Sequence, residues 1–137
     1  MTYEEKVRWL RRYRDALRLE EELRQELEAQ RARACKTTAA LTGMPGGGSS
    51  SRDKIPESVE RILDIVSALH TQTDICTDIC GEIISFVNNI SDTRTEEIFR
   101  RRYIRGETFE AIAEAMDLSS KWVKMLHDKF LQSTNIF

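Results

Sequence analysis

The chain has 137 residues and a net charge of −2, which argues against a general binder of polyanions. Its hydrophobic content of 40% is enough for a folded core, and no apolar run approaches the ~20 residues of a membrane span. The start of the chain is charged, unlike a secretory leader, and the odd number of cysteines suits a reducing compartment. We therefore expect a cytoplasmic protein without a membrane partner.

The first predicted element is a long helix over residues 3–36. Thr2 and Glu5 have the spacing of a capping box, and no Gly or Pro follows before residue 36. Apolar residues then recur at spacings of three and four, and Glu20 and Gln30 occupy two places where apolar residues are expected. The stripe consists of Trp9, Tyr13, Ala16, Leu23, Leu27 and Ala34, with Leu10 and Leu17 beside it. The pattern indicates an amphipathic helix with an imperfect seam.

Residues 37–54 are rich in Gly and Ser and are predicted to be a flexible linker. A second long helix is expected to begin near Pro56, a residue tolerated in a first helical turn. Its apolar positions alternate spacings of four and three, which is a heptad pattern. They are Ile55, Val59, Ile62, Val66, Leu69, Thr73, Cys76, Cys80, Ile83, Val87 and Ile90. We expect the two helices to form an antiparallel, coiled-coil-like hairpin over residues 1–93.

Cys76 and Cys80 lie four residues apart on one helical face, a spacing that can supply two metal ligands. Both also fall on the heptad seam, and no His or acidic pair completes a metal site, so packing in the core is the favoured interpretation. No nucleophile with a matching base is visible either. We therefore expect no catalytic residue, no metal or other cofactor and no small-molecule substrate, so the chain is not expected to be an enzyme.

Three shorter helices are predicted near residues 94–105, 108–116 and 119–133. Thr93 and Glu96 offer a capping box for the first, and Gly106 can end it. Thr108 can cap the second helix, and Ser119 or Ser120 the third. No strand pattern is present, so the predicted fold class is all-α, with a second domain over residues 94–137.

The last two helices have the spacing of a helix-turn-helix. Ala113 is small where two helices must approach closely, Asp117 falls at the turn, and Val123 faces back from the second helix. The turn usually requires a positive φ, which aspartate tolerates better than most residues. The remaining core places are filled by Ile112, Met116, Leu118 and Leu126.

The second helix of such a unit enters the major groove of DNA, so its exposed residues are candidates for base and phosphate contacts. A cluster of arginines upstream could hold the flanking backbone. The predicted DNA-binding residues are Arg100, Arg101, Arg102, Arg105, Ser119, Ser120, Lys121, Lys124 and Met125. The alternative is a small helical core with a solvated charged surface. His127 is expected to have a structural role, and Trp122 to anchor the last helix to the arginine-rich one.

Residues 99–132 resemble the sigma-70 region 4 domain, and most closely a group of small prophage proteins of Gram-positive bacteria of unknown function. The resemblance rests on the arginine-rich helix ending in Tyr103 and Gly106, on residues 108–113, and on Ser120, Trp122–Val123 and Leu126–His127. The run 41–45 with the glycines after it, and Asp53–Lys54, also resemble that group. The resemblance implies control of phage or mobile-element transcription, with double-stranded DNA as one partner and RNA polymerase as another.

Two functions follow from these patterns. The first is a transcription regulator that binds DNA through the helix-turn-helix and pairs as a homodimer through the long helices. The alternative is a coiled-coil adaptor or inhibitor that binds a host protein. It is suggested by residues 52–93, which carry 3 Lys and Arg against 8 Asp and Glu.

Overall fold

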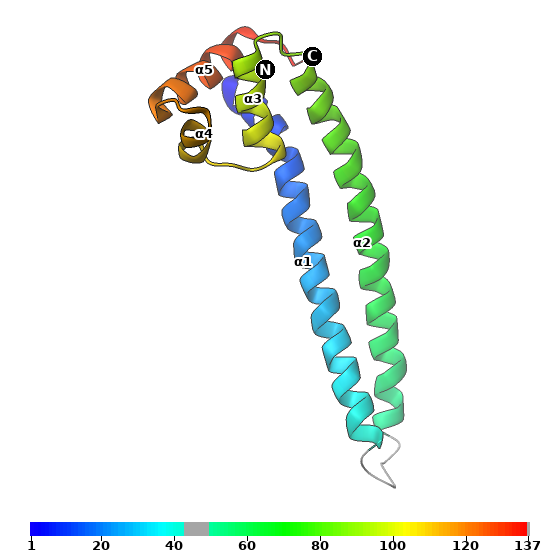
Figure 1. Cartoon of the computed structure of the whole chain (residues 1–137). Coiled ribbons are helices and arrows are strands. Elements are labelled where there is room, and N and C mark those ends of the chain that lie inside the picture. The colour runs from blue at the N-terminus through cyan, green and yellow to red at the C-terminus, as the bar shows by residue number, and fades with distance from the viewer. Residues whose placement is uncertain (43–49, 137) are drawn as a thin grey trace. The chain divides into compact units, whose positions relative to one another are not determined.

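The structure is a computed structural model that describes the backbone of residues 1–42 and 50–136 and the side chains of residues 1–36 and 57–136. Its elements are α1 (Tyr3–Thr42), α2 (Ser50–Asn88), α3 (Thr93–Phe99), the π-helical turn η1 (Arg100–Ile104), α4 (Phe109–Met116) and α5 (Ser120–Ser133). No strand occurs among the described residues. A long helical hairpin, α1 and α2, is followed by short helices, which confirms the predicted fold class (Figure 1).

The long helices extend further than the sequence pattern predicts. α1 continues past residue 36 to Thr42, and α2 begins at Ser50 rather than near Pro56. Residues 37–42 and 50–54 of the predicted linker are therefore helical, and neither stretch contains a Gly or Pro. The remaining part of that linker, residues 43–49, lies outside the described residues.

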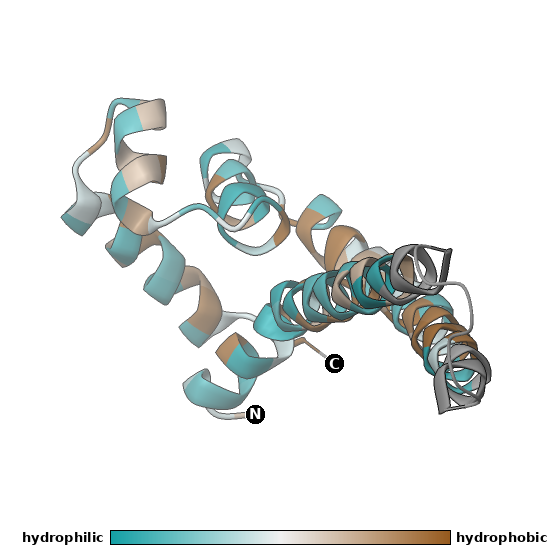
Figure 2. Ribbon diagram, turned by 90° about the horizontal axis from the view of Figure 1, so that it is seen from below, coloured by the Kyte–Doolittle hydropathy of each residue, from teal (hydrophilic) through white to brown (hydrophobic). Residues whose placement is uncertain are grey.

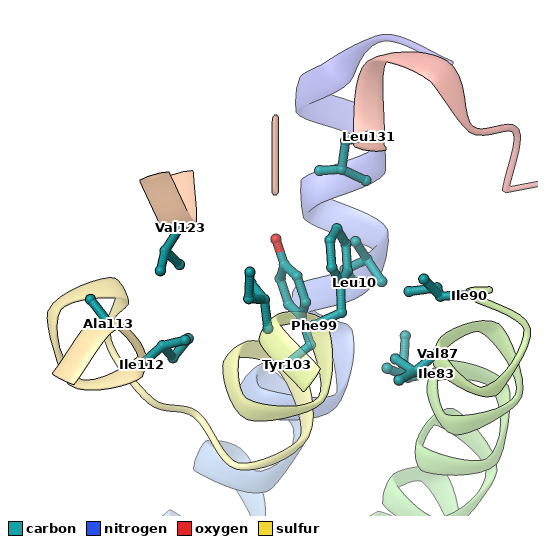
Figure 3. Packing of buried hydrophobic residues seen from close by; sticks show 11 residues of the cluster. Leu10, Ile83, Val87, Ile90, Phe99, Tyr103, Ile112, Ala113, Val123 and Leu131 are labelled. Carbon is teal, nitrogen blue, oxygen red and sulfur yellow. The ribbon is translucent and has the colours of Figure 1, made fainter. Parts of the chain in front are cut away.

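Contacts divide the chain into two compact units. The first consists of Met1–Leu17 and Ile75–Phe137, and the second is Arg18–Asp74. In the first unit, the beginning of α1 and the end of α2 pack with the short helices around one hydrophobic core, whose side chains converge in Figure 3. Its buried members are Leu10, Ile83, Val87, Ile90, Ile98, Phe99, Tyr103, Ile112, Ala113, Val123 and Leu131. The division into domains 1–93 and 94–137 stays a prediction.

The second unit has fewer buried side chains, and two of them are polar. Leu27 and Ile65 are buried together with Glu20 and Gln72. α1 is mostly hydrophilic, whereas α2 carries more apolar residues (Figure 2). The polar content agrees with the imperfect seam predicted for the first helix.

The predicted seam of α2 is displaced within the second unit. Thr73 and Val59 were expected on it, yet Thr73 is exposed, Val59 is 49% exposed, and Gln72 is buried instead. A straight α-helix drifts by about 20° per heptad against a perfect seven-residue repeat. The heptad pattern therefore locates the buried face at Cys76, Ile83 and the residues after them better than at its early positions.

The capping residues explain where several helices begin. Thr2 Oγ1 accepts a hydrogen bond from Glu5 N at 3.2 Å, and Glu5 Oε2 accepts one from Thr2 N at 2.7 Å, so the predicted capping box of α1 is confirmed. The box predicted at Thr93 is wrong. Asp92 caps α3 instead, because its carboxylate accepts from both N and Oγ1 of Thr95.

Candidate nucleic-acid interface

α4 and α5 form a bihelical unit with well-defined ends. Thr108 caps α4 by accepting a hydrogen bond from Ala111 N, and Ser119 caps α5 by accepting one from Trp122 N, each at 3.1 Å. Between the helices, Asp117 has φ 56° and ψ 46°, the left-handed conformation predicted for this turn. Leu118 N then donates to the carbonyl of Ala113 at 2.9 Å, which closes the end of α4.

The side chains between the two helices are buried. Ala113 is 4% exposed, and Ile112 and Val123 are fully buried. Figure 3 shows Ala113 and Ile112 of α4 facing Val123 of α5. Met116, Leu118 and Leu126 pack against this core, so all the side chains predicted to join the helix-turn-helix do so.

A side chain from α1 closes the C-terminal end of α5. Lys6 is 7% exposed, and its Nζ donates hydrogen bonds to the carbonyl oxygens of Leu131 and Thr134, each at 2.7 Å. These are carbonyls that a helix end leaves without partners, and a cation there also interacts favourably with the helix dipole. Lys6 therefore fixes the end of the helix whose beginning is capped by Ser119.

A chain of hydrogen bonds fixes the middle of α5 to its neighbours. Tyr3 Oη donates to Asp128 Oδ1 at 2.6 Å, and His127 Nδ1 lies 2.9 Å from the same oxygen. Tyr103 Oη lies 2.5 Å from His127 Nε2. Because the carboxylate only accepts, His127 Nδ1 carries the proton and Nε2 accepts from Tyr103. The network joins α1, η1 and α5 through a neutral imidazole.

Burial tunes the groups of this network. It lowers the pKa of His127, against the opposing hydrogen bond to Asp128. Burial and the hydrogen bond to Asp128 both raise the pKa of Tyr3, to about 12. For Asp128, partial burial acts upward, but the hydrogen bonds with Tyr3 and His127 outweigh it and lower its pKa. At neutral pH the network therefore holds one carboxylate and neutral partners.

His127 has the structural role that was expected of it, and its ring packs against Phe99. Its ring is 2% exposed and stacks on Phe99, with centroids 4.9 Å apart and an interplanar angle of 18°. Trp122 was expected to anchor α5 to the arginine-rich helix, and this is wrong. Trp122 is 41% exposed, because Phe99 and Tyr103 fill the contact between these helices together with His127.

The predicted arginines lie on and beside η1, and most of them make contacts within the chain. Arg100 forms an ion pair with Glu96 at 2.5 Å, and Arg101 pairs with Glu97 at 3.0 Å and with Glu107 at 3.3 Å. Arg105 is exposed and makes no ion pair with any residue that the structure describes. The carboxylates of Glu96, Glu97 and Glu107 therefore pair with two of the four predicted arginines.

The predicted residues of α5 gather on its first two turns. Lys121 is exposed, Met125 is 45% exposed, and Ser120 is half-buried. Lys124 Nζ lies 3.9 Å from Glu110 and 6.0 Å from the ring centre of Phe109. Arg102 lies over the same ring at 4.2 Å and donates to the carbonyl of Glu107. Phe109, at the start of α4, therefore brings Arg102 and Lys124 together.

Comparison with known protein families agrees with this geometry. Residues 92–133 match the family described as Sigma-70, region 4. They form a sigma-70 region 4-like helix-turn-helix domain. This family is a DNA-binding domain and not an enzymatic one, so the match supports a DNA-binding regulator at this coarse level. No curated protein and no solved structure matches the chain.

The sigma region 4-like domain is completed by residues that the family match does not cover. Lys6, Tyr3 and Leu10 come from α1, and Ile83 and Val87 from α2. Sequence reasoning missed Lys6 and Tyr3 because both look like solvated residues of an amphipathic helix. The sequence did contain one indication that two of the arginines are ion-paired. Glu96 and Glu97 precede Arg100 and Arg101 by four residues, which is the spacing of helical ion pairs.

The cysteines and acidic residues of the described chain do not form a metal site. Within the described part of the chain, no three His, Cys, Asp or Glu side chains are grouped so that they could hold a metal ion. Cys76 is buried in the first unit and Cys80 half-buried. None of the described helices is both long and apolar enough to cross a membrane.

Proposed function

We propose that this chain regulates transcription by binding double-stranded DNA, with α5 in the major groove. The observation that carries the proposal is the sigma region 4-like domain, in which the first two turns of α5 present Lys121, Lys124 and Met125 outward. Both ends of this helix are fixed, by Ser119 and by Lys6. A helix held in this way presents its side chains to DNA in a defined orientation.

The exposed side chains suit different parts of the groove. Lys121 and Lys124 can bind phosphates or the acceptor edge of guanine, and the thioether of Met125 offers an apolar contact for a thymine methyl. Ser120 can contact a phosphate or either kind of base pair. Ser119 accepts a hydrogen bond from the backbone as the cap, and its hydroxyl still has a proton to donate.

The ion-paired arginines Arg100 and Arg101 bind DNA by exchanging a carboxylate partner for a phosphate. Exposed ion pairs are worth about 0–1 kcal/mol, so a phosphate can replace Glu96 or Glu97 at little cost. Arg102 and Arg105 have no carboxylate partner within the described structure, so neither has to exchange an ion pair in order to bind a phosphate. We therefore assign Arg102 and Arg105 the larger share of the phosphate contacts made by the arginine cluster.

The test begins with selection of bound duplexes from a random-sequence DNA library. Binding to an enriched duplex is then measured by fluorescence anisotropy at several salt concentrations. Lys121→Ala combined with Lys124→Ala is expected to weaken binding about tenfold or more and to lower the salt dependence, because each phosphate contact contributes a slope of about −0.9.

Lys36→Ala is the matched control, since Lys36 is an exposed lysine of the second unit, outside the sigma region 4-like domain. It is expected to leave affinity nearly unchanged. Absence of any enriched duplex, together with no binding at low salt, would contradict the proposal.

Three finer parts of the proposal rest on the resemblance and on the hairpin. A role in phage or mobile-element transcription and a contact with RNA polymerase come from the resemblance alone. Pairing of two copies is supported by Leu19, Val59 and Leu63, which are 48%, 49% and 60% exposed on the second unit. Light scattering is expected to give about twice the chain mass of 15.9 kDa. Capture of core RNA polymerase by the tagged protein tests the proposed contact with that enzyme.

The second candidate function is an adaptor or inhibitor that binds a host protein. It is favoured by the acidic segment 52–93, with 3 Lys and Arg against 8 Asp and Glu. Recovery of one host protein from nuclease-treated lysate, by a variant that no longer binds DNA, would favour this function over the first.

A further inference from the structure

An open pocket of about 510 Å³ lies beside the sigma region 4-like domain, within the first unit. Three arginines line it, Arg8 and Arg11 from α1 and Arg102 from η1. Glu4 and Asp15 line it as well, so these five groups leave one net positive charge. Two of the three arginines lie outside the residues that match the family.

The arginines of α1 differ in what they contact. Arg12 forms an ion pair with Glu82, and Arg14 donates to the carbonyl of Ile104. Arg8 and Arg11 are exposed and make no ion pair with any residue in the described ranges. They are therefore the arginines of this helix segment whose charge is available to a partner.

The pocket adjoins the proposed DNA-binding face. Phe109 lines the pocket, and Arg102 lies over its ring at 4.2 Å from the ring centre. Lys124 of α5 lies 6.0 Å from the centre of the same ring. Phe109 is also the first residue of α4. In a helix-turn-helix complex the first of the two helices crosses the DNA backbone while the second occupies the groove. The pocket thus lies where a strand of the duplex would pass.

We propose that Arg8 and Arg11 contact phosphates of the same duplex that α5 reads, so that α1 is part of the DNA-binding surface. The inference rests on the proposed function and extends it to a helix outside the matched family. Arg8 and Arg11 lie three residues apart and so on one face of α1, with Arg102 across the pocket. They add sequence-independent affinity and fix the orientation of the domain on DNA.

The experiment compares Arg8→Gln combined with Arg11→Gln against the wild-type chain, on the duplex selected above. Two lost phosphate contacts are expected to weaken binding roughly ten- to thirtyfold near physiological salt and to reduce the salt slope by about 1.8. Discrimination between the selected duplex and a scrambled one should stay unchanged, since phosphate contacts carry no sequence information.

Arg12→Gln is the control, because it removes one positive charge from the same helix outside the pocket. It is expected to keep the wild-type salt slope, and circular dichroism checks that all variants fold. A wild-type slope for the Arg8 and Arg11 variant would overturn the inference. If the Lys121 and Lys124 variant still loses affinity in that case, the proposed function stands without it. Absence of DNA binding by the wild-type chain overturns both.

Discussion

Both compact units contain parts of the long helices α1 and α2, but their interiors differ. In the unit Met1–Leu17 and Ile75–Phe137, aromatic side chains meet at the centre, and Phe99, Leu10 and Ile83 are fully buried. In the unit Arg18–Asp74, no described hydrophobic side chain is less than 8% exposed, and Glu20 and Gln72 share the interior. Continuous helices therefore do not imply uniform packing along their length.

The difference suggests a division of roles. Presenting side chains to DNA requires a fixed orientation, and the first unit holds α5 through a dense core and buried hydrogen bonds. The second unit exposes Leu63 and Val59 to solvent, which suits association with another helix. Each unit contains leucine, lysine, histidine and aspartate, so the same substitution can be made in both units and its effects compared.

The largest effect is expected from Leu10→Ala compared with Leu27→Ala, both on α1. Leu10 is fully buried in the first unit and Leu27 is 8% exposed in the second. Leu10→Ala should lower the free energy of unfolding by about 3–5 kcal/mol and Leu27→Ala by about 2 kcal/mol, since the thinner interior collapses more easily around a cavity. Urea unfolding followed by circular dichroism measures both, because both units are helical. Equal losses would show that the two interiors are packed alike.

A smaller effect is expected from Lys6→Met compared with Lys36→Met. Lys6 is buried and satisfies two carbonyl oxygens at the end of α5, whereas Lys36 is exposed on α1. Loss of Lys6 leaves these acceptors unsatisfied, at about 1–3 kcal/mol, and Lys36→Met should change stability by less than about 0.5 kcal/mol. Thermal unfolding measures both. A neutral Lys6→Met would mean that water replaces the ammonium at no cost.

The pH dependence of stability should also differ between the units. Burial lowers the pKa of His127, so the unfolded chain takes up a proton at a higher pH than the folded one. The folded state should therefore lose stability as the pH falls below about 6.5, the value of an unperturbed histidine. Melting temperatures between pH 8 and 5 measure this. His127→Gln should flatten the profile, and His70→Gln, an exposed site on α2, should leave it as in the wild-type chain.

The smallest effect is expected from Asp117→Ala compared with Asp64→Ala. Asp117 has a positive φ of 56°, where alanine is disfavoured by about 1 kcal/mol, and Asp117→Gly should be close to neutral. Asp64 is exposed on α2, where alanine is the better helix former, so its replacement should be neutral or slightly stabilising. Chemical unfolding measures the change in the free energy of unfolding for each variant and shows whether it is a loss or a gain. Destabilisation by Asp117→Gly would show that its carboxylate, and not its backbone, matters in the turn.

The parts of the fold that sequence predicts best are those fixed by near neighbours. The spacing of Ala113, Asp117 and Val123 predicts α4, the left-handed turn and α5, because the turn is closed by bonds between adjacent residues. The caps Thr108 and Ser119 are correct for the same reason. At Asp92 the cap was misplaced by one residue, since two neighbouring side chains could serve.

What sequence did not predict depends on contacts between distant segments. Nothing near Lys6 or Tyr3 indicates that they bond to α5, because their partners lie 125 residues away. The exposed Trp122 was misplaced because three other aromatic rings compete for the same interior. The sequence therefore predicted the helix α5 that carries the candidate residues, whose contact with DNA stays a prediction, but not the residues that orient that helix.

The hydrogen bonds from Lys6 to the end of α5 also have a consequence for the order of folding. During synthesis the first turns of α1 emerge well before Leu131 exists, so Leu10 and Lys6 cannot be buried until nearly the whole chain is made. Closing a contact over 125 residues is slow compared with forming a local helix pair. We therefore expect a late and cooperative folding step, and an excised fragment 92–133 that forms its turn but lacks a stable interior.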